Sequence, residues 1–264
     1  MIVNIGFWDL LLIIVVSVQA TILAYLYHPR WKAFMLTLPI PFTIASLAVG
    51  RPIDASNVLG LVLLLVFINC VRLAYQKIRL PIVFAIVIGV LSYCIIGWMI
   101  AGILPTSESA FWLSCTGTFI LAVILLRLLP IPNEQGHRSP LSIWIKLPLI
   151  ITVIFLLILI KNMLRGFMTV FPMVGVIAAY EARNSLRTIN RQIPVLMITI
   201  IPMMIVCRLT QKSIGLGPSL ALGWIAFLSV LLPMTYSMWS ISNMQANERT
   251  RANQKRPKPT SEIK

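Results

Sequence analysis

The sequence predicts an all-α integral membrane protein with about nine transmembrane helices, arranged as two inverted four-helix repeats plus a connecting helix. Of its 264 residues, 59% are hydrophobic and only 11% are charged, and the mean hydropathy is +0.93. A water-soluble domain needs more polar residues than this to cover its core. Apolar stretches of about 20 residues, the length that crosses a bilayer as a helix, recur along the chain. Strand-like alternation, which a membrane barrel requires, is not seen in the sequence.

Turn-forming stretches rich in proline, glycine and charged residues divide the chain into nine predicted spans. We place these spans at residues 5–27, 31–50, 57–76, 81–103, 109–130, 140–161, 163–182, 189–209 and 217–241. The shortest turns separate the third span from the fourth and the sixth from the seventh, so these boundaries rest on the fewest polar residues.

The distribution of Lys and Arg predicts the orientation of the spans, because short basic loops stay in the cytoplasm. With nine spans, alternate loops share one side with the C-terminus, and 17 of the 22 basic residues fall on that side. The other five are Arg51, Lys161, Arg165, Arg208 and Lys212. This split predicts an external N-terminus and a cytoplasmic C-terminus. It also accounts for the net charge of +15 without a nucleic-acid partner.

Residues 243–264 are predicted to form a disordered, basic cytoplasmic tail, because this segment contains too few apolar residues to fold. Its expected partners are the acidic headgroups of the bilayer, and the alternative is a docking site for a cytoplasmic protein. The cysteines all lie within apolar spans and lack CxxC spacing, so neither a metal site, a cofactor nor a disulfide framework is predicted. They are Cys70, Cys94, Cys115 and Cys207.

An internal repeat relates residues 31–63 to residues 164–196, which lie 133 positions later. After a three-residue gap, CVRLAYQK at 70–77 aligns with VCRLTQK at 206–212. The offset is five spans, an odd number, so the two copies must lie upside down relative to each other in the membrane. The identical pairs are Phe34/Phe167, Met35/Met168, Pro39/Pro172, Ile44/Ile177, Ala45/Ala178, Asn57/Asn190, Val62/Val195 and Leu63/Leu196.

The repeat divides the chain into three membrane units and the tail. Residues 1–103 form the first four-helix repeat, residues 104–139 the connecting helix and its loop, and residues 140–242 the second repeat.

Residues 144–204 resemble the GlpM family of small bacterial inner-membrane proteins. The similarity rests on a Lys at the mouth of the first span, Phe171-Pro172 in the second, Tyr180-Glu181 at its end, and SLRTI before a Pro-containing third span. Members are about one repeat long, so this chain resembles a doubled version. The family is linked to efficient alginate production, so the resemblance implies a bacterial inner-membrane location and partners in envelope-polysaccharide biosynthesis. The Gly-rich first span usual in the family is missing.

Charged and amide groups in or near the spans are the first candidates for a binding site, because burying them in the membrane is costly. Arg72 and Arg208 are repeat mates, and we expect them to line a polar cavity at the repeat interface with Glu181 and Asn69. The alternative is that both arginines extend to the lipid headgroups from nearby helix ends.

Prolines within the spans are the second set of candidates. Each removes a backbone donor, so it can break or kink its helix. Broken helices at a repeat interface are how many transporters build solute sites, whereas simple kinks also serve helix packing. The candidates are Pro39 and Pro41 in the second span, Pro172 in the seventh, and Pro194 and Pro202 in the eighth.

Two functions follow from these patterns, and neither is enzymatic, because no catalytic motif is recognised. The first is a small secondary transporter or permease for an anionic or polyhydroxyl solute. The second is an accessory subunit that scaffolds an envelope-polysaccharide machine without transport. The inverted repeat and the matched prolines favour transport. The shortage of buried acidic groups for proton or sodium coupling favours the scaffold.

Overall fold

The structure is a computed structural model that describes residues 6–130, 144, 147–148, 150–152, 154–155 and 164–254. Within these residues the regular structure is entirely helical, which confirms an all-α protein. Seven of the described helices are long and apolar enough to cross a membrane. Most of the predicted sixth span, residues 140–161, lies outside the described residues.

The described helices follow the predicted spans. The second and seventh spans are each made of two short helices, and the third ends in a π-helical turn. In chain order the elements are α1 (Phe7–Tyr25), α2 (Pro29–Thr37), α3 (Ile40–Val49), α4 (Ala55–Arg72), η1 (Leu73–Lys77), α5 (Ile82–Ile103), α6 (Glu108–Leu128), η2 (Arg165–Val170), α9 (Met173–Glu181), η3 (Arg183–Ser185), α10 (Leu186–Ile214) and α11 (Leu216–Gln254).

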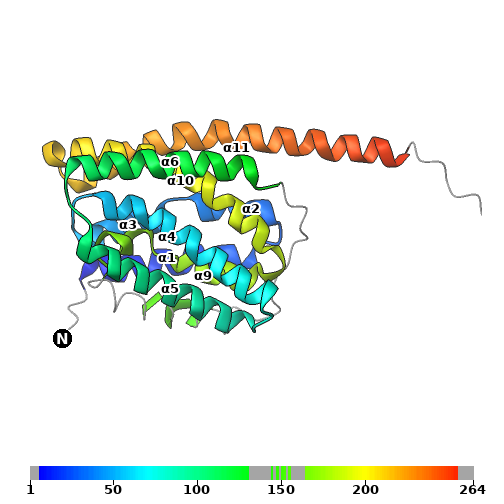
Figure 1. Cartoon of the computed structure of the whole chain (residues 1–264), viewed down its shortest axis with the longest axis horizontal. Helices are drawn as coiled ribbons and strands as arrows, with labels where there is room; N and C mark the ends of the chain where they lie inside the picture. The colour runs from blue at the N-terminus through cyan, green and yellow to red at the C-terminus, as the bar shows by residue number, and fades with distance from the viewer. Residues whose placement is uncertain are drawn as a thin grey trace, which may run out of the picture.

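The long helices run side by side, so the turns gather at two ends of the bundle (Figure 1). The turns that precede α4, α6 and α11 lie at one end, which we call the Ile53 end. The turns that precede α2, α5 and α10 lie at the opposite end, which we call the Glu181 end. α6 ends at the Glu181 end and η2 begins at the Ile53 end, which is the arrangement that the predicted sixth span requires.

Helices α4 and α10 form an antiparallel pair at the centre of the bundle, and their spans are the most buried of the seven. Near the start of α4, the backbone N–H of Ile53 donates to Oε1 of Gln211 at 2.8 Å. Near its end, Nδ2 of Asn69 donates to Oδ1 of Asn190 at 3.1 Å. These two links fix the register of the pair, because each joins the beginning of one helix to the end of the other.

The turn between α3 and α4 has the residues that such a turn needs. Gly50 ends α3 with a φ of 64°, a left-handed conformation that glycine adopts at little cost. Asp54 then caps α4, because its Oδ1 accepts from the N–H of Ser56 at 2.8 Å. Oδ1 of Asn57 accepts from the N–H of Asp54 at 2.7 Å, which completes the capping box.

Helix α11 differs from the sequence prediction. Residues from 243 onward were predicted to be disordered, yet α11 continues to Gln254, well past its apolar portion (Figure 1). The stretch NMQANERTRANQ contains several good helix formers. Adding residues to an existing helix avoids the cost of nucleation, so this polar stretch extends α11 as a helix. The rest of the predicted tail, residues 255–264, lies outside the described residues.

Candidate functional site

The second and seventh predicted spans are both broken at a proline, and the two breaks have the same backbone conformation. Leu38, before the first proline, has φ −66° and ψ 124°, and Phe171, before the second, has φ −55° and ψ 137°. Pro39 follows with φ −80° and ψ 31°, and Pro172 with φ −73° and ψ 48°. The residue before a proline is driven out of the helical region by steric clash, which explains why each helix ends there.

The helices that follow the breaks also start in the same register. The N–H of Thr43 donates to the carbonyl of Pro39 at 2.9 Å, and the N–H of Val176 donates to the carbonyl of Pro172 at 2.8 Å. Thr43 and Val176 are separated by 133 positions, the offset of the sequence repeat. Each of the two spans is therefore divided at its proline, at Pro39 in the second span and at Pro172 in the seventh.

Side chains from α1, α2 and α11 form hydrogen bonds with polar groups on both sides of the first break. Nε2 of Gln19, on α1, donates to the carbonyl of Met35 at 2.9 Å, and the hydroxyl of Thr37 donates to that of Phe34 at 2.6 Å. On the other side of the break, Nε1 of Trp224, on α11, donates to the hydroxyl of Thr43 at 2.9 Å. An unpaired carbonyl is costly at membrane depth, so these donors stabilise the break.

The second break is stabilised by donors from α4 and α5. The hydroxyl of Tyr93, a fully buried residue of α5, donates to the carbonyl of Phe167 at 2.8 Å. Nδ2 of Asn57, on α4, donates to Oγ1 of Thr169 at 2.9 Å and to the carbonyl of Gly166 at 3.4 Å. Thr169 in turn donates to the carbonyl of Gly166 at 2.8 Å. The roles of Tyr93 and Asn57 were not predicted from the sequence, although each residue lies within a predicted span.

We expect the Tyr93→Phe variant to be less stable than the parent protein by about 1–3 kcal/mol, because the carbonyl of Phe167 loses its donor. The ring itself is retained, so its edge contact with Phe171, at 5.0 Å between centroids, is kept. Thermal unfolding in detergent measures the effect. Tyr75→Phe is the matched control, and an equal loss of stability in both variants would contradict the assignment.

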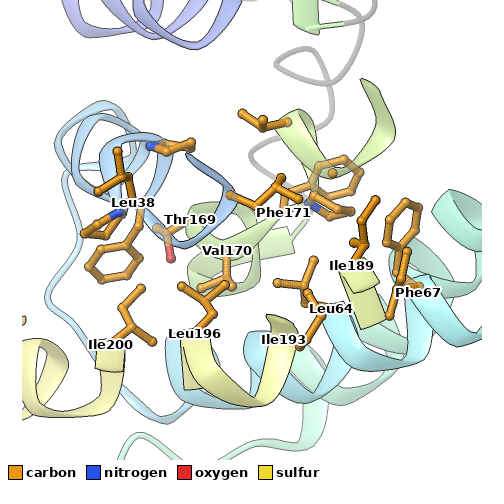
Figure 2. A pocket seen from close by; sticks show the side chains of 18 residues that line it. Leu38, Leu64, Phe67, Thr169, Val170, Phe171, Ile189, Ile193, Leu196 and Ile200 are labelled. Carbon is orange, nitrogen blue, oxygen red and sulfur yellow. The ribbon is translucent and has the colours of Figure 1, made fainter. Parts of the chain in front are cut away.

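A cavity of about 80 Å³ lies between the two breaks. Pro39, Pro41 and Pro172 line it, so the two breaks, which are distant in the sequence, meet at one space. Figure 2 shows this space with Leu38 from the first break and Val170 and Phe171 from the second. Other residues of the two broken spans, together with α4 and α10, complete the wall, and Thr169 has the one polar side chain among the lining residues. We call this space the inner cavity. Among its apolar lining residues are Leu38, Leu64, Phe67, Val170, Ile193 and Leu196.

A second cavity, of about 70 Å³, lies toward the Ile53 end and has a polar wall. Arg51 and Asp54, from the turn before α4, and Thr106, from the turn before α6, contribute to this outer cavity. Asn57 and Thr169 also line it, so Thr169 belongs to the walls of both cavities. A polar space at one end of the bundle therefore adjoins an apolar space between the breaks.

Arg208 lies at the Ile53 end and holds the turn before α4, rather than lining either cavity. Its Nη1 donates to the carbonyl of Ile53 at 2.9 Å, and its Nη2 pairs with Glu108, at the start of α6, at 2.8 Å. Its guanidinium also lies 5.5 Å from the ring centre of Phe111. These contacts join α10, α6 and the α3–α4 turn, which gives Arg208 a positional role.

The other predicted polar candidates lie at the Glu181 end. Glu181 is buried, and its carbonyl accepts from Nζ of Lys32, which is also buried, at 3.4 Å. Asn69 bonds to Asn190 and to the carbonyl of Leu65. Arg72, the repeat mate of Arg208, is at the end of α4. The structure therefore places the two arginines at opposite ends of the antiparallel pair and does not bring the four candidates together at a cavity.

The remaining prolines do not interrupt their helices. Pro41 is the second residue of α3, where the missing N–H would have no intrahelical partner. Pro194 and Pro202 lie inside α10, which is helical from Leu186 to Ile214. Of the two alternatives, a break and a kink, no break is formed at either proline, because a long helix packed on several neighbours tolerates the loss of single hydrogen bonds.

The fold and these cavities define a multi-pass helical membrane protein with paired helix breaks at its centre. Comparison with protein-family models, curated proteins and solved structures finds no match to this chain. The resemblance of residues 144–204 to the GlpM family therefore stays a prediction from the sequence.

Proposed function

We propose that the protein is a small membrane carrier built from two inverted repeats, with its solute site at the paired helix breaks. The observation that carries the proposal is the inner cavity, whose wall includes both Pro39 and Pro172. Irregular backbone at membrane depth persists where it is buried in protein or lines a cavity. Many carriers bind their solute at such a place, between repeats of opposite orientation.

The polar contacts at the breaks support the inverted repeat. In the proposed arrangement α5 corresponds to α11, and the first break corresponds to the second. Tyr93 of α5 bonds at the second break, and Trp224 of α11 bonds at the first. Each repeat therefore stabilises the broken helix of the other, as expected for two intertwined copies related by an axis in the membrane plane.

For the orientation, we propose that the Glu181 end faces the cytoplasm and the Ile53 end faces outward. The turns at the Glu181 end and the nearby helix ends contain most of the basic residues, which favours this placement in a bacterial inner membrane. The polar outer cavity then opens toward the outside, and α11 extends into the cytoplasm.

Transport is favoured over a scaffold role by the space that remains between the breaks. A scaffold needs only rigid packing, and packed interiors leave few voids larger than a water molecule. A carrier needs a cavity that opens to each side in turn. A scaffold subunit of envelope-polysaccharide biosynthesis is the second proposal, and it is favoured by the extended α11, which offers a surface beyond the membrane.

The test of transport uses accessibility and needs no knowledge of the solute. We expect a single cysteine in a Val170→Cys variant, with the four native cysteines replaced, to react with a charged thiol reagent from both sides of the membrane. Val170 lines the inner cavity, and cysteine is close to valine in size. Right-side-out and inside-out vesicles are labelled separately, and the modified fraction is measured.

A Val58→Cys variant is the matched control, because Val58 is fully buried in α4 and does not line either cavity. It should stay unmodified from both sides. Modification of Val170→Cys from neither side would overturn the carrier proposal and leave the scaffold. Modification from one side alone would also overturn it, because alternating access requires both.

A further inference from the structure

We propose that the carrier site takes an α-amino acid with a small apolar side chain, a solute with one positive group, one negative group and one hydrocarbon part. This inference rests on the proposed carrier function and names its substrate class. The basis is the pairing of two unlike spaces, in which the outer cavity has opposite charges on its wall and the inner cavity has an apolar wall.

The outer cavity has a partner for each charge of a zwitterion. The guanidinium of Arg51 is exposed, and it forms no hydrogen bond or ion pair within the described residues, so it is available to a carboxylate. Oδ1 of Asp54 is used by Ser56 to cap α4. Among the described residues Oδ2 of Asp54 accepts no hydrogen bond, which leaves it for an ammonium group. A solute with a single charge would satisfy one of these groups and not the other.

The apolar wall of the inner cavity limits the chemistry of the uncharged part of the solute. Among the described residues that line this cavity, Thr169 alone has a polar side chain, and its hydroxyl already bonds to Asn57 and Gly166. A polyhydroxyl solute would lose its hydrogen bonds to water there without replacement, which is costly for each hydroxyl group. An aliphatic group has no hydrogen bonds to water to lose, and burying its apolar surface is favourable. The apolar wall therefore argues against the polyhydroxyl solute expected from the sequence.

The size of the two spaces favours a small solute. Each cavity has room for a few groups of about the size of a water molecule. That is enough for a carboxylate and an ammonium group in one space and a short branched hydrocarbon in the other. It is far too little for a lipid chain. Because both cavities share Thr169, a solute that passes this residue can place its charged part in one and its apolar part in the other.

Equilibrium binding of radiolabelled L-leucine to the purified full-length protein in lipid nanodiscs tests the inference. Glycine lacks the hydrocarbon part, 4-methylpentanoate lacks the ammonium group, and 3-methylbutylamine lacks the carboxylate. We expect each of these three competitors to bind at least tenfold more weakly than unlabelled leucine. Tight binding of 4-methylpentanoate, or equal affinities for glycine and leucine, would overturn the proposed solute class. A failure of leucine to bind at all would also overturn it.

Two variants test whether Arg51 and Asp54 bind the two charged groups of the solute. Arg51→Gln and Asp54→Asn should each weaken leucine binding at least tenfold, and asparagine caps a helix as well as aspartate does, so α4 is retained. Arg127→Gln is the matched control, because Arg127 is an exposed arginine at the far end of α6. Unchanged leucine affinity in both Arg51→Gln and Asp54→Asn would refute the assignment of the outer cavity.

The Val170→Cys variant separates this inference from the carrier proposal. Leucine should slow modification of that cysteine, because its side chain occupies the inner cavity. Two-sided modification without protection by leucine would refute the amino acid and leave the carrier standing. Modification from neither side would refute the carrier itself.

Discussion

Replacing Gly166 by alanine is expected to lower the free energy of unfolding by about 3 kcal/mol, the upper range for inserting a methyl group into a packed site. A Cβ atom at Gly166 would overlap Oγ of Ser56 and would lie 3.0 Å from Oδ1 of Asn57. Neither neighbour moves freely, since Ser56 bonds to Asp54 and Asn57 bonds to the second break. Thermal unfolding in detergent measures the loss.

Two further variants show whether this contact is the cause. Gly117→Ala, in α6, should leave stability unchanged or slightly raised, because nothing lies within 4 Å of the added atom and alanine favours helix. Ser56→Gly removes the atom that the new methyl group meets, so the double variant of Gly166→Ala and Ser56→Gly should recover part of the loss. Strictly additive effects of the two substitutions would show that the contact is not responsible.

The Arg208→Ala variant is expected to lose about 2–3 kcal/mol of stability, because it removes charge-assisted bonds to a backbone carbonyl and to a carboxylate. Only 10% of the Arg208 side chain is exposed, so water cannot fully replace these bonds. The backbone of Ile53 keeps its hydrogen bonds to Gln211 at 2.8 Å and 3.2 Å, so we expect the structural change to be confined to that end of the bundle. Limited proteolysis of the α3–α4 turn, together with thermal unfolding, measures both effects.

Lys212 provides the control for Arg208, because it approaches the same carboxylate of Glu108 at 3.6 Å but its side chain is 76% exposed. Lys212→Ala should change stability by less than about 0.5 kcal/mol. Arg208→Lys should not restore stability, since an ammonium group cannot contact Ile53 and Glu108 with the fork of a guanidinium. Full stability of Arg208→Lys would instead support an arginine that only extends to the headgroups.

The helix breaks were predictable from the sequence, whereas the polar groups around them were only partly so. Proline fixes its own backbone and restricts the residue before it, so Pro39 and Pro172 act through local chemistry that a sequence shows directly. The donors of Tyr93 and Gln19 depend on which face of a helix meets which carbonyl, and a single apolar sequence does not show this. Asn57 had a signal, because it is one of the identical pairs of the repeat.

The expected meeting of Arg72 and Arg208 failed for a geometrical reason. An axis in the membrane plane, which the proposed inverted repeat entails, carries a residue near one end of a span to the opposite end. Repeat mates near the helix ends are therefore far apart, and only mates near the middle, such as Pro39 and Pro172, come to one cavity. The inverted orientation predicted from the sequence already implied this separation, because it places Arg72 and Arg208 at opposite sides of the membrane.

Because α11 is one continuous helix, a tilt of the last span also moves the polar stretch that extends from it. From the end of its apolar portion at Ser237 to Gln254 it adds 17 residues, or about 25 Å at 1.5 Å per residue. A tilt of the span by about 10° would displace the tip of such an arm by about 4 Å, without bending the helix. A small tilt of the span therefore becomes a displacement of several ångströms at the far end of α11.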